Sequence, residues 1–199
     1  MQIYHIFIFL IAYLICSINP AIEVCKIKNG RDIRELGSKN AGTTNAIRVL
    51  GKVLGTVVFT LDILKVFVSF FIIIFISNVF NFDVSTAEKS IFLIAAILGH
   101  CYPIYYKFKG GKGVAVTIAA ISIINYEIVL VCVIVGVILI LATRMVSVGS
   151  IGGMILLVIM TFVMIPEYII SNIIVSLLVI FKHRNNIVRI FHGNENKLY

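Results

Sequence analysis

Charged residues are scarce in this chain of 199 residues, since only 13% are Asp, Glu, Lys or Arg while 60% are hydrophobic. Soluble globular domains carry about 25% charged residues. The composition therefore excludes an ordinary water-soluble domain. Internal repeats and low-complexity tracts are absent as well, so we expect a single domain over residues 1–199.

Cysteine, histidine and acidic residues are also few. The four cysteines show no pairing pattern, because Cys16 and Cys132 lie in apolar runs while Cys25 and Cys101 lie near basic segments. This argues against a disulfide framework and for a reducing face. The four histidines are scattered and only nine residues are acidic, so we expect no metal site and no cofactor.

Several apolar runs reach the roughly 20 residues that a helix needs to cross the hydrocarbon core of a bilayer. We therefore expect an all-α, polytopic membrane helical bundle. Residues 3–22 lack a basic n-region and a clear cleavage site, which indicates a retained first span rather than a removed signal.

The basic residues indicate the orientation. Of 17, seven lie in residues 26–52, three in 107–112, one is Arg144 and four lie in 182–197. Cytoplasmic loops collect Lys and Arg, and these residues do not form the continuous soluble face that nucleic acid would need. We expect the N-terminus outside, the C-terminus in the cytoplasm and seven short spans, at about 3–22, 53–77, 90–106, 113–125, 127–142, 151–165 and 168–181.

A five-span topology is the alternative, with residues 114–142 and 151–181 each crossing once. The last four predicted spans are short, which favours it. However, it would place residues 125–127 and 166–167 inside helices and send Arg144 outside. Polar residues inside a span are costly, so seven spans are the better prediction.

The first basic segment contains GRDIRELGSKNAGTTNAIRVLG, residues 30–51, whose glycine, serine and asparagine residues from Gly37 to Gly42 disfavour a regular helix. Its small polar side chains and its arginines, Arg34 and Arg48, suit phosphate oxygens. An ordinary cytoplasmic loop with turn-forming residues is the alternative.

The second segment, GHCYPIYYKFKGGKGVAV, has Gly110-Gly111-Lys112-Gly113 at the start of an apolar run. Unpaired amides at a helix start beside a lysine favour an anion. The segment is not a Walker loop, because Tyr106 and Gly113 stand where that motif needs a glycine and a hydroxyl. Lysines that only anchor the spans are the alternative interpretation.

The remaining polar groups are sparser. TRMVSVGS adds Arg144, Ser147 and Ser150, and KHRNNIVRIFHGNENK adds His183 and Asn186, which share a helical face at i, i+3, together with Glu195. Within residues 53–77, Asp62 and Lys65 form an i, i+3 pair that is costly unless buried in the bundle. A structural ion pair is preferred over a catalytic role.

Taken together, three motifs resemble the bacterial acyl-phosphate:glycerol-3-phosphate acyltransferase family: Asp32-Ile33-Arg34 with GSKNAGTTNAIR, then GHCYPIYYKFKGGKGVA, then KHRNNIVRI with HGNE. The resemblance implies transfer of an acyl group from acyl phosphate to the 1-hydroxyl of glycerol 3-phosphate, on the cytoplasmic side of the bacterial inner membrane. Lysophosphatidic acid and phosphate would be the products, and membrane lipid the surroundings.

The resemblance also implies site residues. Ser38, Lys112, His183 and Asn186 would be catalytic, and the substrate-binding residues would be Arg48, Asn40, Thr44, Asn45, Gly110, Gly111, Gly113, Ser147 and Ser150. Either His183 or a substrate phosphate would take the hydroxyl proton, and no acyl-serine forms at Ser38. The chain departs from the family at Lys39, where glycine is common, and at Asn185, where glutamate is common.

Two other classes of function are alternatives. A small transporter or anion channel would also use cations and half-helices at a membrane site, but it should show paired repeats and polar residues through the bilayer. A purely structural assembly factor is the other alternative.

Overall fold

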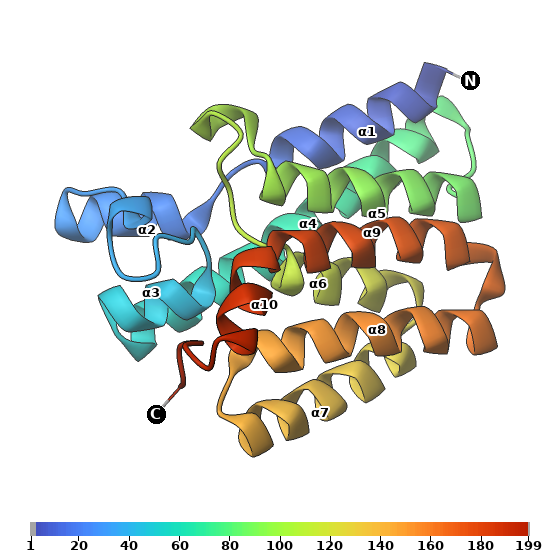
Figure 1. Cartoon of the computed structure of the whole chain (residues 1–199). Coiled ribbons are helices and arrows are strands. Elements are labelled where there is room, and N and C mark those ends of the chain that lie inside the picture. Colours follow the sequence, from blue (N-terminus) through green and yellow to red (C-terminus); the bar gives the residue numbers. More distant parts are fainter. Residues whose placement is uncertain (1–2, 199) are drawn as a thin grey trace. The chain divides into compact units, whose positions relative to one another are not determined.

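The computed structural model describes residues 3–198, and every regular element in that range is helical (Figure 1). The chain divides into two compact units, Met1–Ala120 and Ile121–Tyr199, which are described separately. The first holds α1 (Ile3–Cys16), α2 (Pro20–Asn29), η1 (Ile33–Glu35), α3 (Thr43–Leu50), α4 (Lys52–Phe80), α5 (Thr86–Cys101), η2 (Ile104–Tyr106) and the start of α6 (Val114–Ile124). The second holds the end of α6, then α7 (Tyr126–Thr143), α8 (Val146–Met164), η3 (Pro166–Tyr168), α9 (Ile169–Lys182) and α10 (Arg184–Phe191).

Capping residues determine where several helices begin and end. Asn19 caps α2 by accepting a hydrogen bond from the Ile22 amide at 3.1 Å, and Pro20 occupies the first turn. The helix ends at Gly30, which has a φ of 65°. Asn125 likewise caps α7, accepting from the Ile128 amide at 3.0 Å. Because of these caps, α1 and α2 are separate helices, and so are α6 and α7.

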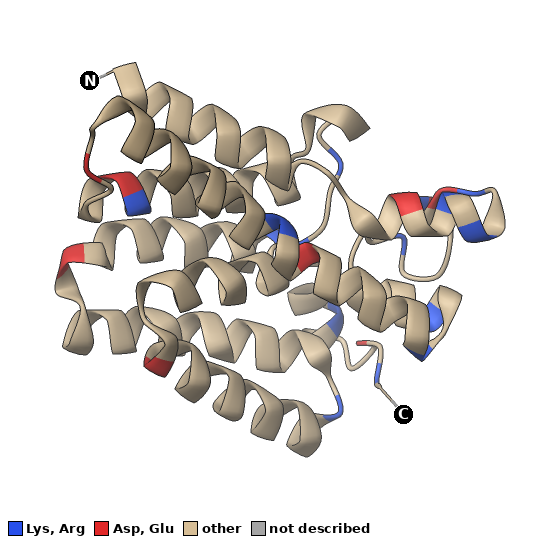
Figure 2. Cartoon of the chain, turned by 180° about the vertical axis from the view of Figure 1, so that it is seen from behind, with Lys and Arg blue, Asp and Glu red and all other residues tan. Residues whose placement is uncertain are grey.

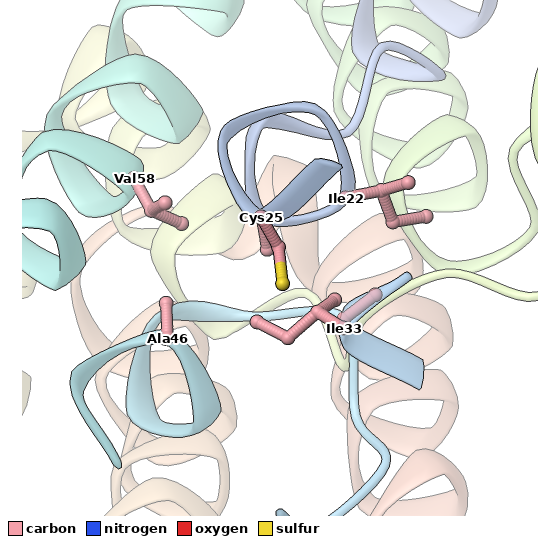
Figure 3. Close-up of a cluster of buried hydrophobic side chains, with 7 residues drawn as sticks. Ile22, Cys25, Ile33, Ala46 and Val58 are labelled. Atoms are coloured by element: carbon pink, nitrogen blue, oxygen red, sulfur yellow. The ribbon is translucent and has the colours of Figure 1, made fainter. Parts of the chain in front are cut away.

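The first unit has a small apolar core close to its polar loops. Side chains from α2, η1, α3, α4 and the loop before α3 meet in it, and Figure 3 labels five of them. Its buried residues are Ala21, Ile22, Cys25, Ile33, Ala41, Ala46 and Val58. This core anchors the segment around residues 30–51 to the start of α4.

In the second unit α8 packs against both α7 and α9. A Cβ atom on Gly149 would lie 2.4 Å from the Gly136 carbonyl oxygen, so α7 and α8 approach too closely for a side chain there. Between α8 and α9, the Asn172 amide donates to the Thr161 hydroxyl at 2.8 Å. Buried polar pairs of this kind satisfy each other inside an apolar bundle.

Five stretches of the described chain are long and apolar enough to cross a membrane: Ile3–Asn29, Lys52–Phe80, Thr86–Tyr106, Tyr126–Thr143 and Val146–Met164. A sixth is Pro166–Lys182 followed by Arg184–Phe191, bent by 57°. The long helices carry few charges along their length (Figure 2). The chain is therefore an all-helical, multi-pass membrane protein.

The seven predicted ranges each contain helix, but several details differ. Residues 3–22 hold two helices, and the connection between the predicted spans 53–77 and 90–106 shrinks to residues 81–85, because α4 continues to Phe80 and α5 begins at Thr86. The breaks at Asn125 and Pro166 interrupt the continuous helices of the five-span topology. However, α6 has only 11 residues, about 16 Å of helix, so the number of crossings and the orientation stay predictions.

Candidate active site

The loop between α5 and α6, residues 102–113, carries the second basic motif. After α5 it turns at Lys107 and Phe108, both with positive φ, and then returns along the end of α5. The Gly110 amide donates to the Cys101 carbonyl at 3.3 Å and the Gly111 amide to the His100 carbonyl at 3.1 Å. Lys112 therefore stands directly before the first turn of α6, where a helix offers unpaired N–H groups.

Arg34 holds the outer part of this loop. Its Nη1 donates to the carbonyl oxygens of Tyr106 at 2.8 Å and Lys109 at 3.1 Å, while Nε and Nη2 donate to the Asp32 carboxylate. The hydrogen bond from Arg34 lowers the pKa of the Asp32 carboxyl, and the same bond raises the pKa of the guanidinium. The sequence suggested that Arg34 suits a phosphate, but its guanidinium nitrogens donate to the loop carbonyls and to Asp32 instead.

Asn45 organises the other polar loop. This side chain, expected to bind substrate, is buried: its Oδ1 accepts from the Ser38 amide at 2.8 Å and its Nδ2 donates to the carbonyls of Leu36 and Asn40 at 3.0 Å. It shapes the loop that carries Ser38 rather than presenting an open amide. Ser38 itself is exposed.

Arg48 is exposed on α3, and Thr44 is half-buried on the first turn of the same helix. Lys39 has a φ of 59°, in the left-handed region that glycine adopts at low cost. A glycine, which the resemblance leads us to expect at this position, would adopt the conformation at lower cost. The absence of regular helix between Gly37 and Gly42 is confirmed.

A buried charge cluster lies in the first unit. Lys65 Nζ lies 2.8 Å from Asp62 Oδ1, donates to the Ile18 carbonyl at 2.7 Å and lies 3.0 Å from His100 Nδ1. All three side chains are less than 10% exposed. The predicted ion pair of Asp62 and Lys65 is therefore formed, and a histidine that the sequence did not single out joins it.

In the second unit, His183 lies between α9 and α10 and is buried. Its Nδ1 is 2.8 Å from the carbonyl oxygen of Val179. A carbonyl oxygen can only accept, so Nδ1 carries a proton, and in the neutral form of the ring the lone pair lies on Nε2. Such a ring can act as a general base.

Asn186 and Ser147 meet at Glu195. The carboxylate accepts from Asn186 Nδ2 at 2.6 Å, from Ser147 Oγ at 2.8 Å and from Arg189 Nε at 2.8 Å. Burial alone would raise the pKa of Glu195, but these hydrogen bonds hold it below the ordinary value of 4.5. Ser150 lies outside this group, since its hydroxyl donates to the Val146 carbonyl of its own helix.

The predicted residues are divided between the two units. The first unit contains Ser38, Asn40, Thr44, Asn45, Arg48 and the Gly110–Gly113 loop with Lys112, and the second contains Ser147, Ser150, His183 and Asn186. No role was predicted for Glu195, although a carboxylate in HGNE, directly after a motif with a histidine and an asparagine, was a signal.

Comparisons with known proteins identify the family of the chain. Residues 6–193 match the family model described as "Glycerol-3-phosphate acyltransferase". A relative of that name from Thermoanaerobacter sp. (strain X514) is 36% identical over 197 residues, covering 98% of this chain and 96% of the relative. One from Staphylococcus aureus (strain Newman) is also 36% identical, over 95% of each chain.

Two solved structures are similar over the same length. Both are crystal structures of PlsY (YgiH), described as an integral membrane glycerol 3-phosphate acyltransferase. The glycerol 3-phosphate form is 34% identical with a TM-score of 0.86, and the lysophosphatidic acid form is 33% identical with a TM-score of 0.82. Each comparison covers 98% of this chain and 95% of the solved one. The chain belongs to the glycerol-3-phosphate acyltransferase family.

Proposed function

We propose that the chain transfers an acyl group from acyl phosphate to the 1-hydroxyl of glycerol 3-phosphate, as the first acylation of phospholipid synthesis. The products are lysophosphatidic acid and phosphate. Family membership over residues 6–193 is the observation that carries the proposal. The similar solved structures are described in forms with glycerol 3-phosphate and lysophosphatidic acid, the acceptor and the product of this reaction.

The first unit supplies the phosphate-binding groups. Lys112 and Gly113 form an anion site at the start of α6, because a phosphate there meets both a cation and the N–H groups of a helix start. Gly110 and Gly111 shape the loop beside it, since their own amides donate to the carbonyls of Cys101 and His100. Arg48, exposed on α3, adds a second cation. Asn40, Thr44 and the exposed Ser38 belong to the same unit and offer hydrogen bonds to the acceptor hydroxyls.

The second unit supplies the proton-transfer groups. The acceptor oxygen attacks the acyl carbonyl carbon, the bond from that carbon to the phosphate oxygen breaks, and phosphate leaves with the bonding electrons. The hydroxyl proton passes to Nε2 of His183, whose other nitrogen is held by Val179, or to a substrate phosphate oxygen. Asn186 and Ser147, held by Glu195, orient the reacting groups, with Ser150 a further polar contact.

No acyl-enzyme forms. The donor is a mixed anhydride and already activated, so catalysis rests on positioning and on stabilising charge that develops on carbonyl and phosphate oxygens. Both units work as one domain in the bacterial inner membrane, with seven crossings, the N-terminus outside and the basic segments facing the cytoplasm.

Purified protein in detergent tests this proposal with acyl phosphate and radiolabelled glycerol 3-phosphate. We expect labelled lysophosphatidic acid and an equal amount of released phosphate. Lys112→Gln should lower kcat/KM about a hundredfold or more, as loss of a charge-stabilising donor does. Lys107→Gln is the control, since that lysine is exposed in the same loop. Wild-type protein that gives neither product nor loss of donor would rule out the activity.

A further inference from the structure

The Lys65 ammonium in the first unit has three N–H groups and three close acceptors. They are Asp62 Oδ1 at 2.8 Å, the Ile18 carbonyl at 2.7 Å and His100 Nδ1 at 3.0 Å. An ammonium has donors and no lone pair. The ammonium therefore pairs with the Asp62 carboxylate by charge and donates to the Ile18 carbonyl, and its contact with His100 requires a lone pair on the histidine.

This contact decides which nitrogen of His100 carries the proton. Nδ1 also lies 3.3 Å from Asp62 Oδ1, a distance that a protonated Nδ1 could bridge. In that case two donors, the ammonium and Nδ1–H, would face each other at 3.0 Å. The contact with Lys65 is shorter than the contact with Asp62, and an ammonium can only donate. Nδ1 of His100 therefore accepts from Lys65, and the proton is on Nε2.

The protonated Nε2 lies against the glycine-rich loop. A Cβ atom built on Gly111 would be 2.2 Å from Nε2 and 2.7 Å from the Ala41 carbonyl oxygen, so the imidazole occupies the space that a side chain would need. The Gly111 amide in turn donates to the carbonyl of His100 at 3.1 Å. The histidine therefore touches Gly111 through both its ring and its backbone.

The same cluster reaches the first polar loop. Asn19, one residue after Ile18, donates through Nδ2 to the Ala41 carbonyl at 3.2 Å. Lys65 donates to the Ile18 carbonyl, Asn19 donates to the Ala41 carbonyl, and the His100 ring lies beside Gly111. One buried network from α4, α5 and the residues before α2 therefore contacts both the loop before α3 and the loop before α6. Buried polar networks favour a single arrangement of the groups that they connect.

We propose that His100, held by Lys65 with its proton on Nε2, is a positioning residue that sets the backbone of the phosphate-binding loop at Gly110–Gly113. The inference rests on the proposed function of that loop. His100 acts through the loop and not on the reacting atoms, and Asp62 neutralises the ammonium that orients it.

Two substitutions separate the two faces of the ring. In His100→Gln the terminal amide nitrogen takes the place of Nε2 and keeps a donor at the loop but loses the acceptor for Lys65. In His100→Asn the side-chain oxygen takes the place of Nδ1 and keeps that acceptor but leaves the loop side empty. We expect His100→Asn to raise the KM for glycerol 3-phosphate about tenfold, because the shorter side chain no longer fills the space beside Gly111 that the ring occupies and the loop shifts. His100→Gln should raise it less than about threefold.

Thermal stability in detergent should rank the two variants in the opposite order, because His100→Gln leaves a donor of the buried Lys65 without a partner. A merely structural role predicts instead that KM follows stability, with His100→Gln the worse enzyme, and that result would overturn the inference. The matched control is His5, which pairs with Glu88 at 2.7 Å at the other end of α5. His5→Asn and His5→Gln should change stability and leave KM unaltered.

Hydrogen–deuterium exchange of the loop amides gives a readout that does not depend on turnover. Amides of residues 109–113 should exchange faster in His100→Asn than in His100→Gln. If wild-type protein acylates nothing but exchange follows this order, the proposed function fails and the positioning role stands. Equal exchange in both variants contradicts the positioning role whatever the activity.

Discussion

Asn186 Nδ2 donates to Glu195 Oε1 at 2.6 Å, so the amide in KHRNNIVRI is oriented by a carboxylate nine residues further on. The same oxygen accepts from Ser147 at 2.8 Å. Asn186 and Ser147 lie on different helices, α10 and α8, and the carboxylate holds both. The C-terminal segment thereby becomes part of the candidate site.

Glu195→Gln should lower both stability and activity. A glutamine offers one acceptor oxygen where three donors converge, and its own amide would face one of them, which costs about 1–3 kcal/mol for a buried donor left unpaired. We expect a lower midpoint of thermal unfolding in detergent and a reduced kcat. The control is Glu167→Gln, an exposed carboxylate in the same unit. Equal midpoints for the two variants would refute the role of Glu195.

The stability of the protein should fall in acid partly through Glu195. Its pKa is lower in the folded protein than the ordinary 4.5, so its contribution is fully present above 4.5 and is lost as the pH falls through the folded value. The midpoint of wild-type protein should therefore drop more steeply below about pH 4.5 than that of Glu195→Gln. Parallel pH curves for the two proteins would contradict this expectation.

Arg34→Lys should impair substrate binding although the charge is kept. The guanidinium reaches two loop carbonyls and the Asp32 carboxylate at once, which a single ammonium cannot do. We expect a rise of about threefold to tenfold in the KM for glycerol 3-phosphate, equivalent to one weakened hydrogen bond. Arg31→Lys should leave the KM unchanged, since Arg31 is exposed and its ion pair with Glu35, at 3.8 Å, is long and exposed to solvent. A KM unchanged in Arg34→Lys would mean that the loop holds its shape without the fork.

Lys39→Gly should stabilise the protein. A non-glycine residue with a φ of 59° is strained by about 1–2 kcal/mol, and a glycine removes this strain. Part of the gain is offset, because glycine has greater conformational freedom in the unfolded chain. We expect a net gain of about 0.5–1 kcal/mol, seen as a higher unfolding midpoint. Lys28→Gly, within α2, is the contrasting variant and should destabilise. A lower midpoint for Lys39→Gly would show that the lysine side chain has a stabilising contact.

Arg144→Cys tests the number of crossings. In a protein whose four native cysteines are replaced by serine, a thiol at the end of α7 should react with a membrane-impermeant maleimide only from the cytoplasmic side. The five-span topology predicts reaction from the outside. Inside-out and right-side-out vesicles of the same preparation distinguish the two, and a second cysteine at Lys197 reports the side of the C-terminus.

The sequence by itself determined the class of the protein. Long apolar runs and scarce charge require a membrane bundle, because an uncompensated polar group inside a bilayer is costly. Local signals also gave the breaks at Asn125 and Pro166, since an N-cap and a proline act on their own neighbours. The three motifs were sufficient to identify the family and to select most of the polar groups that the two units collect.

Only the tertiary structure decided what those groups contact. Arg34 and Asn45 were interpreted as substrate ligands, yet their side chains donate hydrogen bonds to the backbone of loops. The loop partners of Arg34 lie 72 or more residues away in the chain, so a local sequence pattern could not reveal them. Glu195 and His100 acquired roles in the same way, through Asn186 and Lys65 respectively. Hydrogen bonding depends on distance and direction between atoms, and folding alone brings such distant residues together.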